Sequence, residues 1–396
     1  MNRKLLPLLI AGLTAGIAHA DNIPTVYGKV NVTLNQYKFD DIQGTGAAAK
    51  SVDGQDNWQL ESNSSRLGVK GDYPLFGETK AIYKLEYELF ADGTSSSTSA
   101  TKYQTFTQRN TYAGLQSNWG TLFAGKNDTP LKATTAETLQ LFKDLPLADY
   151  KYLLNGENRE NNIVQYATPS LSGFIFSAQL ILGEDTGAAD SATASKSSDQ
   201  NSGLTNKYSL AATYTLDKLY LALAHDQNVQ NADTTRFAAQ YGIGPVSIGG
   251  LYQDAKRHFK NPASSATANG VNTGNVLQAI SSLPANNLNT GVGNPITDFA
   301  GGTYDKQKGY GVDIAWKIND DWTLKGQYLE SKSTPVADTL GDTTAKSYVV
   351  GVDYALSKAA KVFAYYADIK TDGDLSTTLS DSLSDKTYAV GWEFKF

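Results

Sequence analysis

The chain has 396 residues, with 34 basic and 40 acidic side chains and a formal net charge of −6. The lack of cysteine excludes disulfides, thiol chemistry and zinc–cysteine sites, and the acidic balance argues against a nucleic-acid partner. The mean hydropathy of −0.36 is typical of a soluble protein, but such an average does not detect a membrane β-barrel, in which only alternate residues face lipid.

The first twenty residues, MNRKLLPLLIAGLTAGIAHA, have the three parts of a secretory signal peptide. Arg3 and Lys4 precede the apolar run Leu5–Ile17, and Ala18–Ala20 is a small-x-small cleavage site. The apolar run is too short for a membrane-spanning helix. The sequence therefore predicts that residues 1–20 are removed on export and that residues 21–396 form a single domain.

Apolar and polar side chains alternate from residue 26 to the carboxyl terminus. Alternate positions are apolar in segments 26–34, 81–89, 174–180, 208–214, 310–316, 322–328, 348–354 and 388–396. A period of two indicates β-strands with one apolar face. Many of these stripes begin or end in Tyr, Trp or Phe, as a membrane interface favours. A large soluble β protein is the alternative, but its packed core could not bury the charged residues of the opposite face unpaired.

Short and long connections follow each other in turn along this pattern. The short ones are Gly71–Thr79, Gln116–Gly120, Thr168–Gly173, Leu216–Lys218, Gly242–Pro245, Ile318–Asp321 and Ala355–Ala360; the long ones are roughly 40–62, 90–103, 127–158, 183–206, 225–234, 254–307, 330–346 and 368–386. These connections join sixteen strands, which predicts an all-β, antiparallel transmembrane barrel whose last strand pairs with its first. We expect the low-complexity loop 254–307 to be mobile or folded over the mouth.

The loop 127–158 is too apolar for a loop standing in solvent. A short helix is predicted over Pro130–Phe142, and apolar residues recur as far as Leu147. We expect this loop to fold into the barrel and narrow it; the alternative is a surface loop that contacts a neighbouring subunit. Its acidic candidates for the constriction are Asp128, Glu137, Asp144, Asp149 and Glu157.

Basic residues can be assigned to a face by their position within the alternation. A barrel of sixteen strands is too wide for side chains to fill, so water must occupy it. The residues predicted to face this water are Lys29, Arg66, Arg109 and Arg159. An arginine in the middle of the lipid face would cost about 2–4 kcal/mol. The alternative is that these are ordinary wall charges paired with Glu86 or Glu88.

Several segments together resemble one family of proteins. The segments are VYGKVNVTL, SSRLGVKGDYPLFGETKAIYKLEYEL, RNTYAGLQSNWGTLFAGKNDTPL, RENNIVQYATPSLSGF and the terminal Phe396. In this order they are similar to the trimeric general porins of Gram-negative outer membranes, in particular those of neisserial and related bacteria. The third loop lacks the Pro-Glu-Phe-Gly-Gly of that family.

The resemblance implies a homotrimer in the outer membrane with an inward-folded third loop. It also implies a constriction where wall basic residues, here Lys29, Arg66, Arg109 and Arg159, face loop carboxylates. Phe396 would serve as the assembly signal read by the barrel assembly machinery. The expected function is passive diffusion of ions and small hydrophilic solutes, with outer-membrane lipid and lipopolysaccharide as further partners; a substrate-specific channel is the alternative.

A barrel enzyme, such as a phospholipase, is the rival from another class. It would need a histidine with a serine or carboxylate partner, and past the signal peptide only His225, beside Asp226, and His258 are available. No GxSxG motif, metal-ligand cluster or phosphate loop occurs in the sequence. We therefore expect no enzymatic activity, no cofactor and no metal.

Overall fold

The structure, a computed structural model, describes residues 23–38, 40–43, 50–53, 57–92, 106–183, 206–258, 304–335, 341–374 and 380–396. The expected signal peptide and most of loop 254–307 lie outside these residues. No helix in the described ranges is long and apolar enough to cross a membrane.

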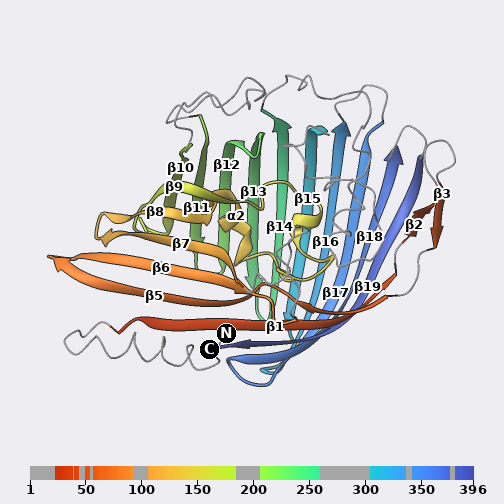
Figure 1. The fold of residues 1–396 in the computed structure, drawn as a ribbon, viewed down its shortest axis with the longest axis horizontal. Coiled ribbons are helices and arrows are strands. Elements are labelled where there is room, and N and C mark those ends of the chain that lie inside the picture. Colours follow the sequence, from red (N-terminus) through yellow and green to blue (C-terminus); the bar gives the residue numbers. More distant parts are fainter. Residues whose placement is uncertain are drawn as a thin grey trace, which may run out of the picture.

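Antiparallel strands follow one another around a closed sheet (Figure 1). They are β1 (Thr25–Lys38), β4 (Asn57–Ser62), β5 (Ser65–Phe76), β6 (Thr79–Leu89), β7 (Phe106–Ser117), β8 (Gly120–Asp128), β9 (Arg159–Ala167), β10 (Phe174–Ile181), β11 (Tyr208–Leu216), β12 (Leu219–Val229), β13 (Ala232–Ile243), β14 (Val246–Arg257), β15 (Tyr304–Lys317), β16 (Trp322–Pro335), β17 (Thr343–Ala355), β18 (Ala360–Asp374) and β19 (Ser380–Lys395). A separate hairpin joins β2 (Asp40–Gln43) to β3 (Lys50–Asp53).

Two of the seventeen strands in this sheet are halves of one barrel strand. Both β4 and β5 pair with β1, β4 along its second half and β5 along its first. Between them Ser64 has a φ of 49°, which interrupts the ladder. The barrel thus has sixteen antiparallel strands, and β1 also pairs with β19 to close it, as the alternation predicted.

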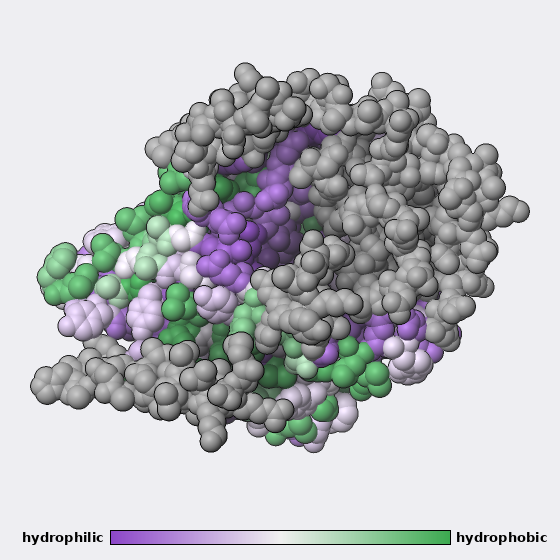
Figure 2. Space-filling model, in the orientation of Figure 1, coloured by the Kyte–Doolittle hydropathy of each residue, from purple (hydrophilic) through white to green (hydrophobic). Residues whose placement is uncertain are grey.

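Each strand has an apolar face and a polar face. On β15 the apolar face carries Tyr310, Val312 and Trp316, which are exposed, whereas Asp313 on the polar face is buried. Figure 2 shows hydrophilic residues gathered in a hollow of the molecule, with hydrophobic residues on the surrounding surface. An exposed apolar face beside a buried polar face is the reverse of a soluble domain and is typical of a membrane barrel.

One connection predicted to be long is a tight turn. The prediction placed a loop over 225–234, but β12 runs to Val229 and β13 begins at Ala232. Asn228, Gln230 and Asn231 take positive φ values between 50° and 59°, a conformation that asparagine tolerates better than most residues. The mostly polar sequence DQNVQNADTT concealed the strands, because alternation is visible only where one face is apolar.

Closure of the barrel depends on a close contact between the two ends of the described chain. The Gly28 N–H donates to the Phe396 carbonyl at 2.8 Å, and the Phe396 N–H donates to the Gly28 carbonyl at 3.1 Å. The Phe396 ring lies over Gly28, where a Cβ would be 2.3 Å from Phe396 Cζ. Glycine is therefore needed at position 28 so that the terminal ring can lie flat against the first strand.

Deleting Phe396, or changing it to Asp, is expected to lower the amount of folded barrel strongly. Deletion removes both backbone bonds to Gly28 and a ring worth about 1.5–3 kcal/mol when buried in an apolar medium. The heat-modifiable band on a denaturing gel measures the folded fraction. Lys395→Gln, at an exposed neighbouring position, is the control; equal folded fractions in all variants would contradict the expectation.

Candidate functional site

The segment 129–158, between β8 and β9, contains the helix α2 (Pro130–Ala136) and the 3₁₀ turn η2 (Tyr150–Tyr152). Thr129 caps α2, its hydroxyl accepting from the Lys132 N–H at 3.3 Å, and Pro130 occupies the first turn. The predicted helix over Pro130–Phe142 is wrong in length. The helix ends at Ala136, after the β-branched pair Thr134 and Thr135, which favours helix weakly.

The apolar residues of this segment pack on the polar face of the barrel strands. Leu139, Phe142 and Leu154 are almost fully buried, and α2 lies against β11, β12 and β13 (Figure 1). Glycines on the strands leave the room that these side chains need. A Cβ on Gly309 would be 2.3 Å from Leu154 Cδ2, and a Cβ on Gly351 would be 2.7 Å from Phe142 Cε1.

Side chains from six strands donate to backbone carbonyls of the segment, which has little regular structure of its own. The donors and acceptors are Tyr220 to Thr134 (2.8 Å), Gln240 to Thr138 (2.6 Å), Lys325 to Leu141 (3.1 Å), Tyr365 to Pro146 (3.1 Å), Gln327 to Ala148 (2.7 Å), Gln307 to Leu153 (3.1 Å) and Gln253 to Asn155 (2.8 Å). Since a buried carbonyl without a donor is costly, these bonds fix the path of the segment across β12 to β18.

Arg236 on β13 is the most buried of the charged anchors, with no exposed surface. Its Nη1 donates to Glu157 Oε1 and to Thr135 Oγ1, both at 2.8 Å, and its Nε donates to Gln253 Oε1 at 2.8 Å. One guanidinium thus joins both ends of the segment to the wall. Arg236 was missing from the sequence prediction, although its alternation with Phe237 places it on the polar face.

Ion pairs cover the part of the polar face that the segment leaves open. The pairs are Lys325–Asp353 (2.9 Å), Lys361–Asp353 (2.9 Å), Lys361–Glu393 (4.0 Å), Lys29–Glu393 (3.9 Å), Lys29–Asp144 (2.7 Å), Arg66–Asp144 (3.3 Å), Lys84–Glu86 (3.4 Å), Arg109–Glu86 (3.0 Å), Arg109–Glu88 (2.9 Å), Arg159–Asp128 (3.0 Å) and Lys132–Asp128 (3.2 Å). This charged belt runs from β16 through β19 and β1 to β9.

Asp144 is where the segment meets the belt. It has a φ of 70°, and its carboxylate lies between Lys29 and Arg66. Burial alone would raise the pKa of Asp144, but the cations Lys29, Arg66 and Arg109 hold it well below its ordinary value. A depressed carboxyl pKa gives stability above the unfolded-state pKa, about 3.9, that is lost as the pH falls through the lower folded value. This contact therefore persists at neutral and mildly acidic pH.

The four predicted basic residues fall into two groups. Lys29 and Arg66 meet Asp144, and Arg159 meets Asp128, so these two carboxylates of the loop do contact wall cations. Arg109 instead pairs with Glu86 and Glu88 of the neighbouring strand, the alternative considered for it.

The other three acidic candidates have different partners. Glu137 is largely exposed and pairs with Lys143; Asp149 accepts from the Asp144 and Lys151 N–H groups within the segment; and Glu157 pairs with Arg236. The sequence prediction also missed six members of the belt, Lys84, Lys132, Lys325, Asp353, Lys361 and Glu393.

The histidines do not form the dyad that an enzyme would need. His225 contacts Thr235 and Gln227, while its neighbour Asp226 is buried and lies on the opposite face of β12. His258 pairs with Asp233 at 2.7 Å. In the described ranges, no group of three His, Asp or Glu side chains is placed to hold a metal ion.

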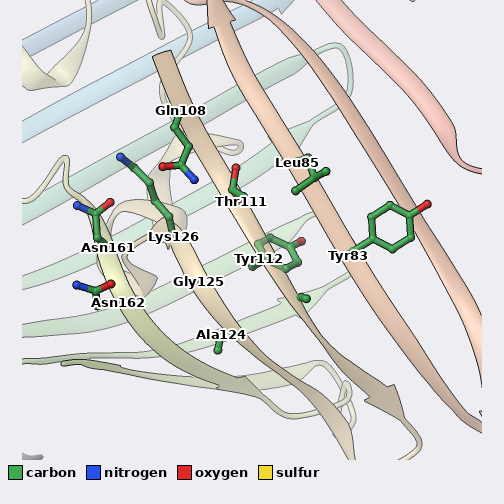
Figure 3. Close-up of a pocket in the computed structure, with 11 residues that line it drawn as sticks. Tyr83, Leu85, Gln108, Thr111, Tyr112, Ala124, Gly125, Lys126, Asn161 and Asn162 are labelled. Atoms are coloured by element: carbon green, nitrogen blue, oxygen red, sulfur yellow. The ribbon is translucent and has the colours of Figure 1, made fainter. Parts of the chain in front are cut away.

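A hollow of about 830 Å³ lies on β6 to β9 (Figure 3). It is lined by Leu85, which is exposed on the apolar face, by the small residues Ala113 and Ala124, and by Lys126. The basic and acidic residues of the belt are not among its lining residues. The hollow is thus separate from the charged part of the polar face.

A closed barrel with an exposed apolar face outside and a charged polar face toward its hollow defines a channel of the outer-membrane type. Comparison with known proteins specifies the family: the profile described as Gram-negative porin matches residues 8–374, and the chain belongs to that family. The protein is therefore an outer-membrane diffusion channel.

Relatives and solved structures agree with this assignment. An outer membrane porin protein of Bordetella pertussis is 27% identical over 384 residues, which cover 92% of this chain and 93% of the relative. The major outer membrane protein P.IB of Neisseria gonorrhoeae is 24% identical over 210 residues, 52% of this chain and 56% of the relative. The anion-selective porin from Comamonas acidovorans has the same fold, with a TM-score of 0.61 at 17% identity over 95% of this chain and 100% of that one.

Changing Arg236 to Met is expected to destabilise the protein by about 3–5 kcal/mol, because it leaves the buried Glu157 carboxylate without its counter-charge. The double variant Arg236→Met with Glu157→Gln should recover part of this loss. Urea unfolding in detergent measures the stability, and protease cleavage within 129–158 reports release of the segment. Single and double variants that both match the parent protein would show that this pair does not hold the segment.

Proposed function

We propose that the polar face lines the channel and that segment 129–158 lies within it and sets its width, so that ions and small hydrophilic solutes diffuse passively. The observation that carries the proposal is the packing of the segment against the polar faces of β12 to β18 through seven side-chain bonds to its backbone carbonyls. A loop in contact with a neighbouring subunit would instead have its apolar residues on the apolar face.

The narrow part of the channel would then be bordered by segment 129–158 and the charged belt, which Asp144 joins to each other. The belt contains eight basic residues, namely Lys29, Arg66, Lys84, Arg109, Lys132, Arg159, Lys325 and Lys361, and six acidic ones, namely Glu86, Glu88, Asp128, Asp144, Asp353 and Glu393. Fixed charges of this kind set ion selectivity. The small excess of cations favours a weak preference for anions, and the structural neighbour from Comamonas acidovorans is named as an anion-selective porin.

Three further features of the mature, assembled protein belong to the same proposal. Residues 1–20 would be removed as a signal peptide, leaving residues 21–396 as one domain, with Phe396 read by the barrel assembly machinery. The mature chain would form a homotrimer, as a trimer form is described for OmpT of Vibrio cholerae, a structural neighbour with a TM-score of 0.59. The named relatives are channels rather than enzymes, and we propose neither catalysis nor a cofactor.

Removing Thr135–Tyr150 and rejoining the ends should leave an assembled barrel, because no strand pairing is changed, and should raise single-channel conductance. Larger sugars should also pass in a liposome-swelling assay. Gly351→Val offers a smaller change in the same direction, since its side chain would displace Phe142; Gly250→Val, on the apolar face of β14, is its control. An unchanged conductance and size limit in a folded deletion variant would place the segment outside the channel.

Changing Arg66 and Arg109 to Ser should shift the reversal potential in a salt gradient toward cations. The first change leaves Asp144 with one cation fewer, and the second leaves Glu86 and Glu88 without their shared partner. Planar-bilayer recording measures the shift, and Lys317→Ser, at an exposed site by the Ile318–Asp321 turn, is the control. If the potential stays constant in both single variants and the double variant, these arginines do not line the narrow part of the channel.

A further inference from the structure

Three neighbouring strands carry a regular grid of side chains on the polar face, where β1, β5 and β6 lie side by side (Figure 1). In strand register its three rows are Lys29, Arg66 and Glu88; Tyr27, Gly68 and Glu86; and Thr25, Lys70 and Lys84. The first row meets Asp144 of segment 129–158, and the third row lies nearer the short turn that joins β5 to β6. Each outer row thus carries two cations, and the middle row carries a tyrosine.

The Tyr27 side chain crosses the middle row of this grid. Its hydroxyl donates to Glu86 Oε2 at 2.9 Å, and its ring lies over Gly68, where a Cβ would be 2.4 Å from Tyr27 Cζ. Gly68 is buried beneath the ring, whereas the ring itself is only partly buried. We call this ring the tyrosine platform. A side chain at position 68 would lift it from the wall, so glycine allows the ring to lie flat across β5.

Two ammonium groups lie close to the tyrosine platform. Lys70 Nζ is 5.3 Å and Lys84 Nζ is 5.8 Å from the centroid of the ring, within the range of a cation–π contact. The two lysines stand directly opposite each other in register, and like charges in this arrangement destabilise a sheet. An anion that lies between the two ammonium groups would relieve their repulsion.

The carboxylates around the tyrosine platform are paired with other cations. Glu86 pairs with Arg109 at 3.0 Å, and Asp72, the next polar-face residue along β5, pairs with Lys80 at 3.0 Å. Lys70 is exposed and has no carboxylate partner within the described part of the chain. Its positive charge is therefore available to a solute.

An aromatic face and an uncompensated ammonium group favour one class of solute. The face of an aromatic ring is negative, so it repels an anion placed directly over it, but it stacks well against another ring. A solute with a flat ring and a carboxylate can stack on Tyr27 while its carboxylate lies between Lys70 and Lys84. We propose that the tyrosine platform and this lysine pair form a binding site for aromatic carboxylates, of which benzoate is the simplest.

The two halves of the site exclude simpler occupants. An inorganic anion would need the lysines but not the ring, and a neutral sugar would need the ring but not the lysines. The inference rests on the proposed function, because a solute reaches this grid only if the polar face lines the channel. Asp144 ties the segment to Arg66 one row away, so a bound solute would lie beside the narrow part of the channel and reduce the ion current.

The test records chloride current through the full barrel in planar bilayers and adds benzoate, cyclohexanecarboxylate or acetate as a blocker. The three have the same charge, but the first has a flat ring, the second a puckered ring and the third no ring. Tyr27→Leu removes the platform, Gly68→Ala displaces it through the close contact with Cζ, and Tyr27→Phe keeps it. Lys70→Gln with Lys84→Gln removes the ammonium pair, and Lys80→Gln, further along the same face of β6, is the matched control.

We expect benzoate to halve the chloride current of the parent protein at a roughly fivefold lower concentration than cyclohexanecarboxylate, because only the flat ring stacks. Tyr27→Leu and Gly68→Ala should lose this preference, whereas Tyr27→Phe and Lys80→Gln should keep it. The double lysine variant should need roughly tenfold more of each ring-bearing carboxylate for the same block, since hydrogen bonds to charged groups are the strong ones.

Equal block by benzoate and cyclohexanecarboxylate in the parent, or an undiminished benzoate preference in Tyr27→Leu, would overturn the proposal. Unchanged block in the double lysine variant would also overturn it. These results differ from a failure of the proposed function: a folded barrel that conducts chloride without a benzoate preference refutes the site alone, whereas a folded barrel that conducts no chloride refutes the channel. The heat-modifiable band measures the folded fraction of each variant.

Discussion

The requirement that every backbone polar group in a bilayer be bonded within the protein determines most of this structure. A sheet meets it only when its first and last strands pair, and here the pairing extends from Lys38 with Lys386 to the mutual bonds of Gly28 and Phe396. The exposed apolar face, the buried polar face and the position of every wall residue follow from that closure. Even Gly28 is a consequence, because the terminal ring of Phe396 occupies the space of its missing side chain.

The same requirement applies to segment 129–158, which is not paired with neighbouring strands and so has no sheet hydrogen bonds for its backbone. Its carbonyls are bonded by glutamine, tyrosine and lysine side chains from the wall, and its apolar residues fit beside strand glycines. The polar face is thereby divided into two kinds of surface. The strands from β12 to β18 carry amides and glycines that hold the segment, whereas the charged belt continues from β16 through β1 to β9.

Alternation in the sequence was sufficient to predict the sixteen strands, because a lipid-facing stripe must be apolar at every second residue. It failed where neither face is apolar, as in the β12–β13 turn. It also failed where the pairing register of two neighbouring strands shifts, as between β6 and β7. Arg109 was placed on the polar face by its opposition to Tyr112, yet a register shift between Leu85 and Tyr87 puts Tyr112 on the polar face as well. Its ring packs on Phe123, a buried residue. Bulges of this kind depend on local geometry that composition does not reveal.

The site was predictable only in part, for a related reason. Residues of the wall could be assigned to a face one by one, so Lys29, Arg66 and Arg159 were found together with their carboxylate partners among the loop candidates. Which loop carboxylate meets which cation depends on the path of an irregular segment, and this path depends on Arg236, Gln253 and other distant side chains. The helix was predicted too long for a local reason: it ends at Ala136, after the β-branched residues Thr134 and Thr135, although the apolar pattern continues beyond it.

Fixing the segment to six strands has a mechanical consequence. A barrel wall one layer thick can become elliptical through small changes in the angles between its strands. Segment 129–158 is bonded to β12 to β16 and to β18 and, by way of Asp144, to Lys29 on β1 and Arg66 on β5. It therefore ties together wall strands that are far apart around the circumference, and any flattening must stretch or break these bonds. This tie opposes flattening under lateral pressure from the bilayer, so the bonds of the segment contribute to the cross-section of the barrel.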